Sequence, residues 1–124
     1  MVTANKENAV SFLRLIVSGE VREAYRNYAS PAFIHHNPYF RGDVESLMLA
    51  MAENAAAYPD KRLEIKHAIE EGNMVAVHSH IQLEQGDIGR AIVHIFRFEN
   101  ERIAELWDVG QPIPAESPNE NGAF

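Results

Sequence analysis

The residue best placed to do chemistry in this 124-residue chain is Asp108, which directly follows the only tryptophan, Trp107. Burial against a large apolar ring destabilises the charged form of a carboxylate, and a carboxylate tuned in this way can act as a general acid or base near neutral pH. The alternative is a solvated aspartate that follows a core tryptophan. We take Asp108 as the leading catalytic candidate.

Histidines supply further candidate groups, because an imidazole titrates near neutral pH. His78 and His80 are two residues apart, so on a strand they would share a face and could polarise one substrate oxygen. Of the adjacent His35 and His36, only one can face a cavity. His36 is also predicted as a catalytic residue and would orient the substrate. The predicted substrate-binding residues are Asn37, Trp107, His94, Phe12 and Phe96.

Strand parity leaves a second arrangement open for these histidines. Val75, Val77 and Ser79 alternate with His78 and His80, and the sequence alone does not say which set faces inward. If the apolar set is the inner one, both histidines lie on the outer face of the sheet. His94 shares a face with apolar neighbours and could instead be a hydrogen-bonded core residue.

A metal site is a further alternative. Gly72, His78-x-His80 and Glu84 resemble the first metal motif of the cupin family in their spacing. Cupins consist almost wholly of strands and carry a second motif with Pro, Gly and a third His, whereas this chain begins with helical patterns and His94 follows no Pro-x-Gly. We expect no metal, although two histidines two residues apart could converge on an ion.

Composition excludes several functional classes. Eighteen acidic against eleven basic residues give a net charge of −7, so nucleic acid is not an expected partner. There is no cysteine, which removes disulfides and thiolate chemistry and fits a reducing compartment. The start of the chain is too polar for a signal peptide, and no apolar run reaches membrane-spanning length. We expect a cytoplasmic protein that does not contact a membrane.

Apolar residues recur every three or four positions in the first half of the chain, which predicts three helices. Gly19 and the prolines at 31 and 59 account for their ends. The predicted helices run from Thr3, a candidate N-cap, to Gly19, from Val21 to Ser30, and from Asp43 to Tyr58.

After residue 61 the pattern changes to alternation, which is typical of half-buried antiparallel strands. On the first of these strands, Leu63, Ile65, His67 and Ile69 are expected on one face. Turn signals at 71–73, 84–89 and 99–101 separate it from three more, and 32–36 forms a short strand. We predict an α+β domain over 1–114, a cone-shaped barrel in which N-terminal helices pack in a curved antiparallel sheet, and a mobile tail over 115–124.

Four segments resemble the SnoaL-like polyketide cyclases of the nuclear transport factor two-like superfamily: Phe33–Pro38 with Gly42, Glu71–His78, Ile95–Glu99 and Arg102–Pro112. The resemblance covers about Asn5 to Pro114. It implies a cone-shaped barrel, commonly a homodimer, whose apolar cavity works by side-chain acids and bases without cofactors. Relatives of SnoaL close rings by intramolecular aldol condensation, and other members isomerise steroids, dehydrate small substrates or hydrolyse epoxides.

Residue by residue, the resemblance narrows the reaction. Where ketosteroid isomerases carry an Asp base, a Tyr and a protonated Asp, this chain has Asn37, Phe12 and His94, which disfavours that arrangement. Against limonene epoxide hydrolase, the Arg-x-Asp pair is replaced by His78-x-His80. The last-strand Asp of SnoaL is matched by Asp108. We therefore expect a small, largely apolar carbonyl compound as ligand, no cofactor and a homodimer, with a non-catalytic binding module of the same fold as the alternative.

Overall fold

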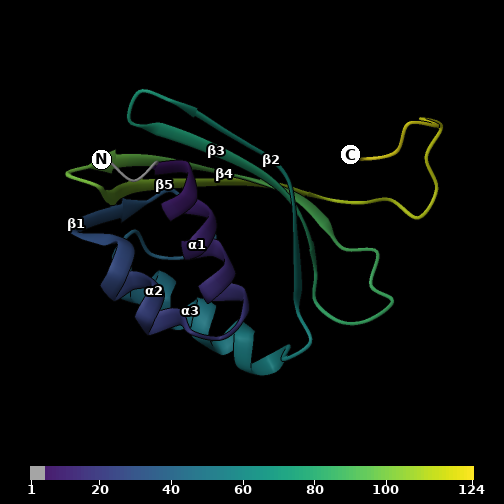
Figure 1. Cartoon of the computed structure of the whole chain (residues 1–124). Coiled ribbons are helices and arrows are strands. Elements are labelled where there is room, and N and C mark those ends of the chain that lie inside the picture. The colour runs from purple at the N-terminus through teal and green to yellow at the C-terminus, as the bar shows by residue number, and fades with distance from the viewer. Residues whose placement is uncertain (1–4) are drawn as a thin grey trace.

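The helices and strands of the chain follow the predicted order, as a computed structural model of residues 5–124 shows (Figure 1). The helices are α1 (Asn5–Val17), α2 (Val21–Tyr28) and α3 (Val44–Ala57). The strands are β1 (Ala29–His35), β2 (Arg62–Glu71), β3 (Met74–Gln82), β4 (Arg90–Glu99) and β5 (Arg102–Pro112). The proposed cap Thr3 lies outside the described residues. Among the helices of residues 5–124, none is long and apolar enough to cross a membrane.

All five strands form one sheet in the order β1-β5-β4-β3-β2. The pairs from β2 to β5 are antiparallel, whereas β1 runs parallel to β5. The three helices lie on one side of the curved sheet (Figure 1). The α+β cone is thus confirmed, with the difference that the sheet is mixed, because the chain leaves α2 directly into an edge strand beside β5.

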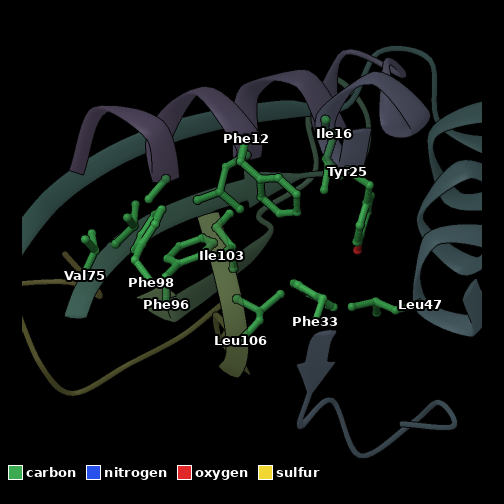
Figure 2. Close-up of a cluster of buried hydrophobic side chains, with 14 of the residues drawn as sticks. Phe12, Ile16, Tyr25, Phe33, Leu47, Val75, Phe96, Phe98, Ile103 and Leu106 are labelled. Atoms are coloured by element: carbon green, nitrogen blue, oxygen red, sulfur yellow. The ribbon is translucent and has the colours of Figure 1, made fainter. Parts of the chain in front are cut away.

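Aromatic side chains fill the space between α1, α2 and the sheet (Figure 2). Phe12 of α1 is 1% exposed and Phe96 of β4 is 0% exposed, and their ring centroids lie 6.1 Å apart in an edge-on arrangement. Tyr25 of α2 packs edge-on against Phe12 at 5.1 Å and against Phe33 of β1 at 5.5 Å. This layer fixes which face of each strand points inward.

An irregularity in β2 changes which of its residues are inside. The pairing of β2 with β3 shifts between Ile65 and His67. A one-residue shift moves every later side chain to the other face. Leu63, Ile65 and then Ala68 pack against the core, whereas Ile69 is 65% exposed. The predicted common face of β2 is therefore wrong beyond Ile65.

Candidate functional site

The site begins with a row of inward-facing side chains across the middle of the sheet. Val77 of β3, His94 of β4 and Asp108 of β5 are direct cross-strand partners in this row. These side chains face inward because Val75, Phe96 and Leu106, two positions away on the same three strands, are buried and lie on the same face of the sheet. Asp108 and His94 are half-buried, so the sheet brings together two of the predicted site residues among apolar neighbours.

Asp108 is held by the segment that follows β1. The Nδ2 group of Asn37 donates a hydrogen bond of 2.9 Å to Asp108 Oδ2. Asn37 is itself fixed by His35, whose Nδ1 accepts from the Asn37 backbone N–H at 3.1 Å, while His35 Nε2 donates to the Arg41 carbonyl oxygen at 2.6 Å. His35 is only 5% exposed. This pair of hydrogen bonds assigns one tautomer to His35 and orients the amide of Asn37 toward the carboxylate.

An open cavity of about 580 Å³ lies next to this carboxylate. Its wall combines Asn37 and Phe40 from the segment after β1, Asn54 from α3, and Ile92 and Asp108 from the sheet. The volume is in the range of small-ligand pockets, and a few polar groups in a mixed wall can orient a ligand. Asp108 Oδ2 accepts the hydrogen bond from Asn37, whereas Oδ1 has no hydrogen-bond partner within residues 5–124.

Two buried polar groups near Asp108 have no hydrogen-bond partner within residues 5–124: the Tyr25 hydroxyl and His94 Nδ1. Figure 2 shows the Tyr25 hydroxyl directed away from α1, toward the level of Phe33 and Leu47. Burial, and then the negative charge of Asp108, raise the pKa of Tyr25. Burial lowers the pKa of His94 to about 4. The negative charge of Asp108 opposes this shift, and the positive charge of Lys61 adds to it. Both groups are therefore neutral at pH 7, and unsatisfied buried polar groups call for an explanation.

A lysine contacts this cavity wall from behind, through the lining residue Asn54. Lys61 immediately precedes β2 and has the same parity as the inward-facing Leu63 and Ile65. Its Nζ donates a hydrogen bond to Oδ1 of the cavity residue Asn54. Burial lowers the pKa of Lys61.

The structure corrects the expectation that His78 and His80 flank Asp108. Their strand neighbours Val77 and Ser79 are buried on the concave face, so both histidines lie on the outer face, as the alternative parity allowed. There His78 stacks on His67 at 5.3 Å, and Phe124 of the C-terminal segment packs against His78 at 5.4 Å and His80 at 4.9 Å. His80 Nε2 donates to the Ile88 carbonyl oxygen at 2.8 Å.

The predicted positions of His36 and Trp107 beside the cavity are also wrong. The two rings stack at 5.0 Å on the outer face, and His36 Nε2 lies 2.5 Å from Glu105 Oε2, which places neither ring beside Asp108. Alternation is the reason, because Leu106 and His35 are the inward neighbours. Trp107 therefore does not wall the cavity. Phe12 and Phe96 do face inward but are sealed in the core rather than open to the cavity.

Sequence reasoning missed Tyr25, His35, Asn54 and Lys61. Lys61 directly follows the turn residues Pro59 and Asp60, so the sequence pattern assigns it to the turn. It lies two residues before Leu63, and this spacing could have indicated that it shares the inward face. Asn54 occupies a polar position on α3, three residues after Met51, which packs against the core. Among residues 5–124 no three His, Asp or Glu side chains are arranged to hold a metal ion.

Comparisons with known proteins agree with this fold. The SnoaL-like domain family matches residues 9–106. No functionally curated protein matches the sequence. An NTF2-like protein of unknown function from Cytophaga hutchinsonii superposes with a TM-score of 0.70 at 18% identity, covering 90% of this chain and 94% of that chain. The IdmH protein of Streptomyces antibioticus, a proposed polyketide cyclase, superposes with a TM-score of 0.70 at 17% identity over 88% and 93% of the two chains.

A proposed polyketide cyclase from Acidithiobacillus ferrooxidans gives a TM-score of 0.68 at 19% identity, covering 90% of this chain and 91% of that chain. At these identities the structural likeness concerns the fold alone. The family match spans most of the chain, from the first helix to the strand that carries Asp108. The chain belongs to the SnoaL-like domain family and has the NTF2-like fold.

Proposed function

We propose that this chain binds a small, largely apolar carbonyl compound in the cavity beside Asp108 and catalyses proton transfer at the carbon next to the carbonyl group. The observation that carries the proposal is a half-buried carboxylate, held through one oxygen by Asn37, at the wall of a cavity of about 580 Å³. A positioned carboxylate with one free oxygen can accept and return a proton.

The two unpaired polar groups give this chemistry a second component. When a proton leaves the α carbon, negative charge develops on the carbonyl oxygen as an enolate forms. Neutral, buried donors aimed at that oxygen stabilise it most, because they need no reorganisation in a site of low polarity. The Tyr25 hydroxyl and His94 Nδ1 are buried, neutral and without partners in the described chain, which suits them to this role.

An enolate that attacks a second carbonyl group of the same molecule closes a ring. The proposed polyketide cyclases among the structural neighbours support this aldol-type outcome. The structure of this chain supports the proton transfer more directly than the ring closure. The proton transfer requires only one carboxylate, Asp108, with the Tyr25 hydroxyl and His94 near it, and needs no second catalytic acid.

The test uses deuterium exchange, which requires no knowledge of the natural substrate. A panel of cyclic and aromatic ketones is incubated with the protein in D₂O, and incorporation at the α carbon is followed by mass spectrometry. We expect Asp108→Asn, which keeps shape and hydrogen bonding, to lower the exchange rate by about 100- to 10,000-fold.

The matched control is His78→Gln, which removes an outer-face imidazole and should leave exchange unchanged. Exchange that survives in Asp108→Asn would refute the assignment. Ketones that bind without any exchange in the unmodified protein would identify a binding module instead.

A further inference from the structure

Lys61 is the least expected residue beside the cavity, because a lysine amine is costly to bury and this one has no carboxylate partner in residues 5–124. The chain has three lysines. Lys6 is exposed, and Lys66 pairs with Glu64 and lies over the Phe124 ring at 4.9 Å. Lys61 alone points inward, and its single side-chain hydrogen bond goes to Asn54.

One hydrogen bond defines the position of this amine relative to the proposed site. Asn54 lines the same cavity as Asp108 and holds Lys61 Nζ through its Oδ1, so the amine is one hydrogen bond away from the cavity wall. The charge of Lys61 also acts on His94, the direct cross-strand partner of Asp108. Lys61 therefore lies directly behind the Asn54 side of the cavity that Asp108 also lines.

We propose that Lys61 is a nucleophile that forms a covalent imine with the carbonyl group of the ligand. The inference rests on the proposed function, because it requires a carbonyl compound in this cavity. The Nζ lone pair forms a bond to the carbonyl carbon while the C=O π pair moves to oxygen. The oxygen then leaves as water, so that a lysine ammonium and a carbonyl group together give an iminium ion and one water molecule.

The surroundings of Lys61 favour this step. A lysine is nucleophilic only when it is unprotonated, and partial burial increases that fraction by lowering its pKa. The iminium nitrogen withdraws electrons from the adjacent α carbon, whose proton would pass to Asp108 on the wall of the same cavity. Hydrolysis by water returns the free amine, so the cycle needs no further reagent.

Reductive trapping tests the proposal with benzaldehyde as the probe, an apolar carbonyl compound without α protons. The protein is treated with benzaldehyde and sodium cyanoborohydride at pH 7, digested after glutamate and analysed by mass spectrometry. Cleavage at Glu64 separates Lys61 from Lys66, so each lysine reports independently. We expect labelling at Lys61 to exceed that at Lys6 and Lys66 by about tenfold, with the excess lost in urea, where burial no longer distinguishes the amines.

Two variants complete the design. Lys61→Arg keeps the positive charge but cannot form an imine, and it should remove the fast-labelling site, whereas Lys66→Arg should leave it intact. If the extent of labelling in the unmodified protein instead increases with the exposure of each lysine, so that Lys6 is labelled most, the inference is overturned. This outcome requires no variant. If the ketone exchange depends on Asp108 while Lys61 stays unlabelled, the imine is refuted and the proposed function stands.

Discussion

Replacing His94 by glutamine should change how the stability of the protein depends on pH. Burial lowers the pKa of His94 from 6.5 to about 4 in the folded chain. As the pH falls through 6.5, the unfolded chain takes up the proton while the folded chain does not, so the free energy of unfolding decreases until about pH 4. Each pKa unit is worth about 1.4 kcal/mol, which gives a loss of about 3 kcal/mol across this window.

The measurement is urea unfolding of both proteins, followed by far-UV circular dichroism between pH 7.5 and pH 4.5. Carboxyl groups whose pKa is lowered by hydrogen bonds, such as Glu105 and Asp87, affect both proteins equally and cancel in the difference. We expect the stability of the unmodified protein, relative to His94→Gln, to fall by about 3 kcal/mol toward the acidic end. A difference that stays constant within about 0.5 kcal/mol would refute the view that His94 is buried in its neutral form.

Two further expectations concern the core and the outer face of the sheet. Phe96→Ala empties a fully buried position between Phe12 and Phe98 and should lower the free energy of unfolding by about 3–5 kcal/mol in the same urea assay. We also propose a homodimer through the outer face, where Ile69 is 65% exposed, so that light scattering gives twice the 14.0 kDa of one chain. Ile95→Asp at the centre of this face should restore the mass of one chain, and a single-chain mass for the unmodified protein would contradict the dimer.

The sequence was sufficient for the elements and the fold class, because hydrophobic periodicity and turn residues act locally. Of the residues predicted for the site, the fold joins Asp108 and Asn37 by a hydrogen bond, and their roles stay predictions. The sequence did not determine the inner face of β3, because His78 and Val77 lie on alternating positions that fit either face equally well. Only the packing of the helices against Val77 decides between them.

The remaining errors arise from tertiary contacts. The register shift after Ile65 reverses the second half of β2, and no local signal in Lys66 or His67 marks it. Tyr25 could be recognised as a core residue from its helical spacing. Its position near Asp108 depends on how α2 crosses the sheet. The mobility of residues 115–124 stays a prediction.

The parallel pairing of β1 with β5 has a consequence for folding. Strands β2 to β5 can form by successive hairpins, which close within microseconds because their ends are near in sequence. Asn37 and Asp108, in contrast, are 71 residues apart, and they meet only when the first strand docks on the last. Closing so large a loop is entropically costly and slow, so this edge is expected to form late. A ribosome-bound chain would carry its helices and most of its sheet before it could bind anything, and the competent cavity would arise in the final docking step.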